Sequence, residues 1–506
     1  MDFFRSARFD TRVQQLMAKL HIPGLSIAII HGEETASRAF GVACTSSSKP
    51  CTPDTLFNIA SSSKVLTAAS IALLVQDANH PDLTFTTPVS RLLPDDFVLP
   101  IEEYTRNVTI DDLLGHRTGM ASSYLGVHAA RPDDARSVTR NLRNLQICAP
   151  LRTKYVYCNM MYTAATHLIE TQTGLSFSDF LEAHFFEPLG MSSSSLQPSL
   201  SRRRGLGQHI ALGHMWDETE GLYREFPTVD APEAQGAGCV VTSVEDYIKL
   251  VRALMRREAP ISQQVYDGLT MIRSFPDPTP HSSLDAVKSP SFYCAGLEVT
   301  YNRGHTVIGH NGRIAGFGSH FFFIPSLDFG CVMMGNATET ALLAVALEQE
   351  LIDSIVLNSN GSSLPSQEMN VPPFGERCSR QPRARLRAKE AEPQKMPLSV
   401  YIGQYWNPGY RGLEIQIRDS ALFIDATDRS SAVELTLCHV SDQTQYLANV
   451  HLGKALGGMQ NVSQMRAEFI FENDRAVKFG LAIEENLAEL IWFDRIHDDA
   501  SAYVFI

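Results

Sequence analysis

The apolar residues along the chain change their spacing several times, and each spacing predicts a different element. Between Arg12 and Leu20 they recur at helical intervals, which predicts a helix. Residues 24–43 hold two stretches of strand character around the short turn His31-Gly32-Glu33, which predicts a β-hairpin. Residues 65–76 are apolar on nearly every side and contain neither Gly nor Pro, a pattern typical of a buried helix.

The later patterns define the fold class. Helical spacing recurs at Tyr162–Glu170, Phe177–Phe185 and Val244–Arg256, within a region punctuated by Pro, Gly and Ser. Strand patterns and a last helix pattern follow at Phe292–Tyr301, His305–Gly309, Ser319–Ile324, Phe329–Gly335 and Ala341–Leu357. Strands bracketed by an early and a late helix predict a mixed α/β (α+β) fold, in which helices flank an antiparallel sheet and a mainly helical insertion interrupts it.

Composition changes beyond this region. Residues 358–398 are rich in Ser, Pro and Asn and then in Arg, with few large apolar residues, which predicts an exposed linker. The basic cluster in it is an alternative interaction site, but a solvated linker is favoured. Short alternating runs follow at Leu413–Arg418, Ala421–Ile424, Glu434–Cys438, Arg466–Phe471 and Leu487–Phe493. We therefore expect a first domain over 1–357, a linker over 358–398 and a small all-β barrel over 399–506.

Charge and composition exclude several classes of function. The net charge of −13 argues against a nucleic-acid partner, and no apolar run reaches the roughly 20 residues that span a membrane. The first residues do not resemble a signal peptide, so a cytoplasmic location is expected. The nine cysteines are scattered, with no metal-ligand spacing and no disulfide framework. We expect reduced thiols and neither a metal nor another cofactor.

Ser61-Ser62-Ser63-Lys64 is the first candidate for chemistry. Residues three apart share a face only in a helix, and the buried helix pattern follows directly. Ser46-Ser47-Ser48-Lys49 has the same spacing, but Pro50 and Pro53 make a helix there unfavourable. In the first helical turn Ser61 would meet free N–H groups, and burial would lower the pKa of Lys64 so that it accepts the serine proton. The alternative is a capping serine beside a lysine that reaches solvent.

Tyr157-Cys158-Asn159 is the second candidate and precedes a helix pattern. A phenol beside a lysine ammonium can have a lowered pKa and relay protons, which makes Tyr157 a candidate shuttle. The Asn159 amide could hold a substrate carbonyl or the lysine. The same spacing in Tyr405-Trp406-Asn407 lies in the expected barrel, and a packed tyrosine is the usual explanation for so short a motif.

His310-Asn311-Gly312 is the third candidate, between a strand pattern and the glycine-rich stretch that begins at Arg313. Glycine on a strand lets a ligand or another backbone approach closely. The N–H of Arg313, which follows it, could form an oxyanion hole with the N–H of Ser61. A simple turn with a satisfied histidine is the alternative. The chain contains neither a Gly-x-Ser-x-Gly nor a His-Glu-x-x-His motif.

In this order the three motifs resemble those of penicillin-recognising serine enzymes, with residues 12–357 closest to the branch of class C β-lactamases, D-amino-acid peptidases and esterases. Further similar segments are Phe57-Asn58-Ile59-Ala60-Ser61, Leu113–Met120, Pro188–Met191 and Gly236–Cys239. The resemblance implies that Ser61 is acylated, Lys64 is the base, Tyr157 shuttles the proton and Asn159 binds a carbonyl. The C-terminal part resembles the lipocalin-like barrel of some members.

One departure from the family pattern bears on the substrate. His310 stands where β-lactamases have a lysine that helps to bind the substrate carboxylate, and histidine is a weaker, pH-dependent cation. We therefore expect a small-molecule ester, thioester or amide rather than a penicillin. Cys158 occupies a position where small or hydroxyl residues are common, and it is expected to be tolerated.

Three functions remain open from the sequence. The leading one is a serine hydrolase or acyltransferase that acts through a Ser61 acyl-enzyme in a secondary-metabolite pathway, with an acyl-carrier-bound thioester among the candidate substrates. The second is a peptidase or amidase for D-amino-acid compounds, and the third is a ligand-binding scaffold without activity. The barrel is expected to cover the cleft or to mediate assembly. Unchanged turnover, specificity and oligomeric state without residues 399–506 would contradict that expectation.

Overall fold

The computed structural model describes residues 1–129, 133–276, 287–359, 392–459 and 462–496. Its contacts divide the chain into two units. Unit 1 comprises Met1–Gly119, Asp134–Arg140 and Pro150–Val371, and unit 2 comprises Met120–Asp133, Asn141–Ala149 and Pro372–Ile506. Most of the predicted linker, 360–391, lies outside the described residues.

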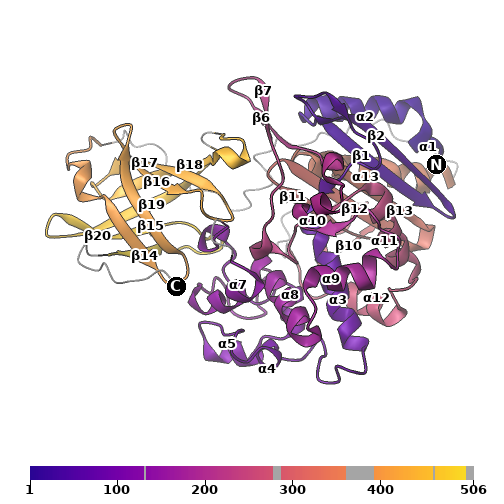
Figure 1. Ribbon diagram of the computed structural model, residues 1–506, viewed down its shortest axis with the longest axis horizontal. Coiled ribbons are helices and arrows are strands. Elements are labelled where there is room, and N and C mark those ends of the chain that lie inside the picture. The colour runs from indigo at the N-terminus through magenta and orange to yellow at the C-terminus, as the bar shows by residue number, and fades with distance from the viewer. Residues whose placement is uncertain (130–132, 277–286, 360–391, 460–461, 497–506) are drawn as a thin grey trace. The chain divides into compact units, whose positions relative to one another are not determined.

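Unit 1 is built on an eight-stranded antiparallel sheet in the order β3-β2-β1-β13-β12-β11-β10-β9 (Figure 1). Its strands are β1 (Gly24–His31), β2 (Glu34–Cys44), β3 (Lys49–Pro50), β9 (Phe292–Tyr293), β10 (Glu298–Asn302), β11 (His305–Ile314), β12 (Phe317–Ile324) and β13 (Phe329–Gly335). The first hairpin therefore pairs with the last strand, as the register Leu25↔Gly335 to His31↔Phe329 shows. β1, β12 and β13 are buried along nearly their whole length because helices cover both faces of the sheet.

Helices α1 (Asp2–Arg5), α2 (Ala7–Lys19) and α13 (Thr340–Ser359) bury one face of this sheet (Figure 1). Phe9 and Val13 of α2 pack in a single core with Ile27 of β1 and Leu347 of α13. Burial of each such side chain contributes about 1.5–3 kcal/mol. The opposite face contacts α11 (Val244–Arg256), whose Tyr247 ring lies 5.3 Å from that of Phe321 in β12.

A mainly helical region lies between the two parts of the sheet. Its helices are α3 (Lys64–Gln76), α4 (Val89–Leu92), α5 (Glu102–Asn107), α6 (Ile110–Leu114), α7 (Ala135–Asn141), α8 (Asn159–Thr173), α9 (Phe177–Leu181), α10 (Pro198–Arg203), α11 and α12 (Gln263–Thr270). Two small sheets accompany them, one formed by β4 (Phe57–Asn58), β8 (Val240–Thr242) and β5 (Ser195–Leu196), the other by β6 (Gly213–Asp217) and β7 (Leu222–Phe226).

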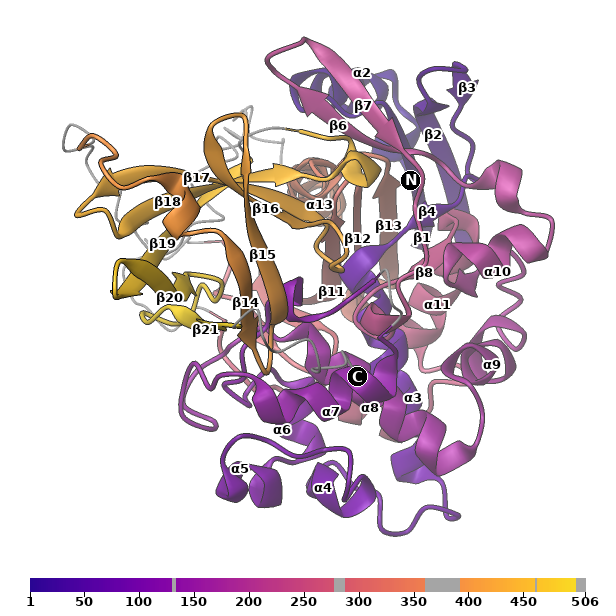
Figure 2. The same cartoon turned by 60° about the vertical axis from the view of Figure 1, so that its left-hand side comes forward.

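Unit 2 contains a closed eight-stranded barrel (Figure 2). Its strands are β14 (Gly403–Asn407), β15 (Arg411–Arg418), β16 (Ala421–Ala426), β17 (Val433–Ser441), β18 (Gln445–Leu452), β19 (Ser463–Glu472), β20 (Arg475–Leu481) and β21 (Ile491–Arg495). Closure leaves no free sheet edge. Buried aromatic rings such as Tyr405, Phe469 and Phe479 lie 5.0–6.4 Å apart and form part of its core.

Two segments from the first half of the sequence belong to unit 2, although the sequence-based boundaries place them in the first domain. The buried Glu484 carboxylate accepts the N–H groups of Ser122 and Ser123 at 2.9 and 3.1 Å and the Tyr410 hydroxyl. The Asn141 amide donates to the Gly409 carbonyl at 3.0 Å. Residues 120–133 and 141–149 are therefore structural parts of unit 2.

The predicted fold class is confirmed: an antiparallel sheet with helices, a mainly helical region within it, and an all-β barrel. Val244–Arg256 and Phe329–Gly335 have the predicted bounds. The predicted strand Phe292–Tyr301 is two strands, since the chain turns at Gly296, where φ is +64°. The strand predicted to end at Gly309 continues to Ile314, and β14, β18 and β20 were not predicted. Among the described helices, none is long and apolar enough to cross a membrane.

Candidate active site

Ser61 lies in the 3₁₀ turn Ala60–Ser63, directly before α3 and one turn earlier than the α-helical position predicted. Ala60 has a φ of +46°, a conformation that L-residues rarely adopt. The Asn58 side chain accepts the Ala60 N–H at 2.9 Å and supports this turn. Strained backbone of this kind persists where surrounding contacts enforce it and is frequent at functional sites.

The three predicted catalytic side chains meet at the Ser61 hydroxyl. Lys64 Nζ lies 3.0 Å from Ser61 Oγ and donates to the Ala237 carbonyl at 2.7 Å. The Tyr157 hydroxyl donates to Ser61 Oγ at 2.8 Å. The spacing of Ser61 and Lys64 therefore puts both groups on one face, as predicted. Tyr157 lies at the end of the chain segment that precedes α8. Its contact with Ser61 joins residues that are 96 positions apart in the sequence.

Burial determines the protonation of this site. Lys64 is fully buried, and loss of solvent lowers its pKa well below the ordinary value of a lysine. Burial raises the pKa of Tyr157 above its usual range, although the hydrogen bond with Ser61 opposes this. The expectation of a lowered tyrosine pKa is therefore wrong, because the burial of Tyr157 outweighs its hydrogen bond with Ser61. Burial therefore favours the uncharged forms of the amine and the phenol that face the serine.

Asn159 begins α8, and its Oδ1 is buried without a hydrogen-bond partner in the described part of the chain. An unpaired buried acceptor is costly, so this atom is a natural partner for a substrate N–H. Lys64 does not take it, since the hydrogen bonds of Lys64 go to Ser61 and Ala237.

The third motif lies within β11, where the backbone passes close to the nucleophile turn. A Cβ atom on Gly312 would meet the Ile59 carbonyl oxygen at 2.1 Å, so only glycine fits. Ser319 reinforces this approach by donating to the same carbonyl at 2.7 Å. Strand alternation places the Arg313 side chain on the face opposite to Gly312, where its charge acts on Glu339.

His310 is 3% exposed, and its two ring nitrogens have internal partners. Nδ1 lies 2.5 Å from the Asn311 carbonyl oxygen, and Nε2 lies 3.2 Å from the Tyr293 hydroxyl. Burial lowers the pKa of His310 to about 3. The expected pH-dependent cation at this position is therefore wrong: the imidazole is neutral throughout the physiological range.

Sequence reasoning missed the groups behind the motifs. Tyr293 and His116 are fully buried and contact each other through a 3.2 Å hydrogen bond. His116 lies within the segment Leu113–Met120 that supports the family resemblance, and that resemblance could have identified it as a site residue. Tyr293 lies on the two-residue edge strand β9, and no local pattern distinguishes it.

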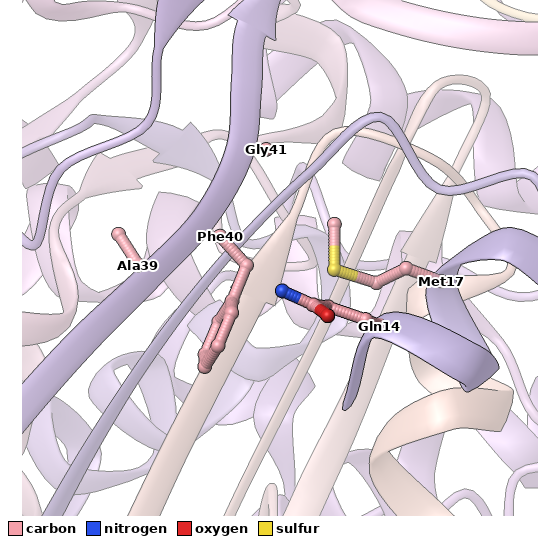
Figure 3. A pocket seen from close by; sticks show the side chains of 5 residues that line it. All are labelled: Gln14, Met17, Ala39, Phe40 and Gly41. Carbon is pink, nitrogen blue, oxygen red and sulfur yellow. The ribbon is translucent and has the colours of Figure 1, made fainter. Parts of the chain in front are cut away.

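A pocket elsewhere in unit 1 is separate from this site. It lies between α2 and β2 and is lined by Gln14, Met17, Ala39, Phe40 and Gly41 (Figure 3). None of these side chains titrates or acts as a nucleophile, so the pocket offers no catalytic group. No group of three or more His, Cys, Asp or Glu side chains suited to a metal ion occurs among the residues that the structure describes.

Comparisons with known proteins identify the family of this chain. Residues 9–352 match the family model Beta-lactamase, and residues 387–495 match a domain of unknown function, DUF3471. The chain is 34% identical over 450 residues to unguisins hydrolase ungD' of Aspergillus campestris, covering 86% of this chain and 82% of the relative. It is 31% identical to unguisins hydrolase ungD of Aspergillus violaceofuscus, covering 97% and 90%.

Solved structures show the same fold. An octameric penicillin-binding protein homologue from Pyrococcus abyssi is 20% identical, with a TM-score of 0.58 and coverage of 96% of this chain and 99% of its own. The D-amino acid amidase from Ochrobactrum anthropi is 21% identical, with a TM-score of 0.55 and coverage of 70% and 100%. The family match spans more than half of the chain, and the two hydrolase relatives cover most of it. The chain therefore belongs to the β-lactamase and penicillin-binding-protein family of serine hydrolases.

Proposed function

We propose that this protein hydrolyses an amide or ester bond of an uncharged secondary metabolite through an acyl-enzyme on Ser61. The observation that carries this proposal is the Ser61 hydroxyl, held between the fully buried Lys64 amine, whose pKa burial lowers, and the partly buried Tyr157 phenol, whose pKa burial raises. A neutral amine can accept the serine proton as the oxygen attacks. A lysine in its ordinary, protonated state has no lone pair for this step.

The reaction follows from the positions of the groups. Ser61 Oγ bonds to the substrate carbonyl carbon while its proton passes to Lys64 Nζ, and the carbonyl oxygen becomes an oxyanion. The N–H groups of Ser61 and Arg313 stabilise that oxyanion. The proton then passes through Tyr157 to the leaving nitrogen or oxygen, which breaks the acyl bond. Water then attacks the acyl carbon and gives up a proton along the same groups. The bond between that carbon and Ser61 Oγ breaks, the oxygen regains its proton, and the acid product leaves.

Three observations support the substrate class. His310 is neutral, so this position supplies no cation for a substrate carboxylate. The unpaired Asn159 Oδ1 suits an amide N–H. Both fungal relatives are named as hydrolases of unguisins, and we propose an unguisin or a related amide as the substrate of this chain. Those names also favour water over an acyl acceptor, while an acyl-carrier thioester remains the substrate to test for acyl transfer.

The test compares wild-type protein with Ser61→Ala. Both are incubated with a fluorophosphonate probe, p-nitrophenyl acetate, nitrocefin and unguisins, and turnover and intact mass are followed. We expect labelling and hydrolysis that disappear in Ser61→Ala, with little nitrocefin cleavage. Ser46→Ala, in the matched Ser-x-x-Lys sequence without a helix, should behave as wild type.

Each alternative function has its own outcome in this experiment. Labelling that persists in Ser61→Ala would refute Ser61 as the nucleophile. Absence of labelling in the wild type would favour a binding scaffold. Cleavage of D-amino acid amides in place of unguisins would favour the peptidase function. A stable acyl-enzyme released only by an added amine or alcohol would favour acyl transfer.

A further inference from the structure

A chain of buried hydrogen bonds joins the second motif to the third behind Ser61. The Cys158 N–H donates to His116 Nδ1 at 3.1 Å. His116 Nε2 lies 3.2 Å from the Tyr293 hydroxyl, which lies 3.2 Å from His310 Nε2. His310 Nδ1 lies 2.5 Å from the Asn311 carbonyl oxygen. The two histidines and Tyr293 are each no more than 3% exposed.

The two ends of this chain determine the direction of every bond. A backbone N–H can only donate, so His116 Nδ1 accepts and its Nε2 carries the proton. A carbonyl oxygen can only accept, so His310 Nδ1 carries the proton of that ring. With both rings neutral, His116 Nε2–H donates to Tyr293 and the Tyr293 O–H donates to His310 Nε2. Every donor and acceptor is then satisfied, as burial requires.

A neighbouring tyrosine does not supply a competing proton. The Tyr162 hydroxyl donates to the Leu114 carbonyl at 2.7 Å, while its oxygen lies 3.5 Å from that of Tyr293. A cationic His310 would present a second N–H to Tyr293 and leave the tyrosine proton without a good acceptor. The charged or titratable groups that act on His310 are Lys64, His320, His116 and Tyr293.

We propose that Tyr293 is a positioning residue that links the complementary neutral tautomers of His116 and His310 and thereby braces the Cys158 backbone against β11. Both ring nitrogens of His310 are then used inside the protein, so the third motif orients the backbone around Gly312 instead of binding substrate. We therefore expect the enzyme to prefer acyl groups that lack a carboxylate. This catalytic consequence rests on the proposed function.

Histidine-selective ¹⁵N NMR tests the hydrogen-bond chain through Tyr293 without a measurement of enzyme activity. In wild type we expect the Nδ1–H tautomer for His310 and the Nε2–H tautomer for His116. The signals are assigned by their loss in His310→Gln and His116→Gln. Neither histidine should titrate between pH 5 and 8. In Tyr293→Phe the Nε2 signals of both rings should shift, because His116 loses the acceptor of its Nε2–H and His310 loses the donor to its Nε2. Tyr301→Phe is the matched control, because Tyr301 is 45% exposed on the neighbouring strand β10. A wild-type His310 that titrates in this range, or unchanged signals in Tyr293→Phe, would overturn the inference.

Kinetics test the consequence. Because Tyr293 acts through the backbone around Gly312, we expect the loss of its hydrogen bonds in Tyr293→Phe to lower kcat about tenfold with KM nearly unchanged. Wild type should hydrolyse p-nitrophenyl butyrate more efficiently than mono-p-nitrophenyl succinate, which ends in a carboxylate. Equal or reversed preference would refute the selection. The NMR result needs no turnover. It therefore distinguishes failure of the hydrogen-bond chain through Tyr293 from failure of the proposed function.

Discussion

Burial of a single amine gives this site its reactivity. Lys64 is fully buried in α3, where a lysine is rarely found without a charged partner, and its hydrogen bonds go to a hydroxyl and a carbonyl. The desolvation that lowers its pKa also opposes folding, because the unfolded chain binds the proton that the folded chain excludes. Burial of Lys64 therefore reduces stability while it favours the uncharged amine that can act as a base.

Replacement of Lys64 by methionine should separate activity from stability. Without a base, acylation of Ser61 should fall about 10²–10⁴-fold. The folded-state pKa of Lys64 lies below its unfolded value of about 10.4, so wild-type stability rises with pH by up to about 1.4 kcal/mol per unit between the two. Lys64→Met should be more stable than wild type at pH 7 and lack that component of the slope. Urea unfolding at pH 7 and pH 9 measures both, and identical slopes would contradict the prediction.

At the scale of elements, the sheet and its last helix are joined by polar contacts to the buried Glu348 carboxylate. Glu348 of α13 lies 2.6 Å from His320 Nε2 of β12 and 2.9 Å from Lys288 Nζ. Burial alone would raise the pKa of Glu348, but the His320 hydrogen bond and the Lys288 charge lower it to about 2. These contacts connect segments up to 60 residues apart.

Acid should weaken this connection between β12 and α13. The folded pKa of Glu348 is depressed, so its stabilisation is present above the unfolded value of about 4.3 and disappears as pH falls toward about 2. Glu348→Gln should cost about 3–5 kcal/mol at pH 7 and reduce the pH dependence in that window. Glu102→Gln, in an exposed pair with Arg106, should cost less than about 1 kcal/mol. Thermal unfolding from pH 7 to pH 3 compares them, and equal losses would contradict the prediction.

At the scale of the whole molecule, the two units are not consecutive pieces of sequence. The segments 120–133 and 141–149 start and end next to site segments, since Gly119 follows His116 by three residues and Pro150 precedes Tyr157 by seven. Met120, Val127, Leu142 and Leu145 in them are buried. Glu484 and Gly409 form hydrogen bonds with these two segments, so the part of unit 2 after residue 372 supports their structure.

Removal of residues 372–506 should therefore destabilise the remaining chain. Their removal would leave the Ser122 and Ser123 N–H groups and the Asn141 amide without their Glu484 and Gly409 partners, at about 1–3 kcal/mol for each group that stays buried. Glu484→Ala should lose about 1–3 kcal/mol, while the exposed Glu485→Ala should lose almost nothing. Thermal unfolding and binding of a hydrophobic dye measure these losses. A truncated chain that unfolds at the wild-type temperature would show that these segments do not depend on the barrel.

The sequence by itself determined the fold class, the main helices and strands of the first domain and the proximity of Ser61 to Lys64, because hydrophobic period and helical spacing are local properties. It distinguished Ser61 from Ser46 for the same reason: only one of the two precedes a helix pattern. Tertiary structure decided what depends on distant neighbours. The raised pKa of Tyr157, the neutrality of His310, the part played by Tyr293 and the inclusion of residues 120–133 in unit 2 all arise from burial and from contacts between segments far apart in the sequence. Desolvation and hydrogen-bond direction are set by the surrounding protein, and residue spacing does not encode them locally.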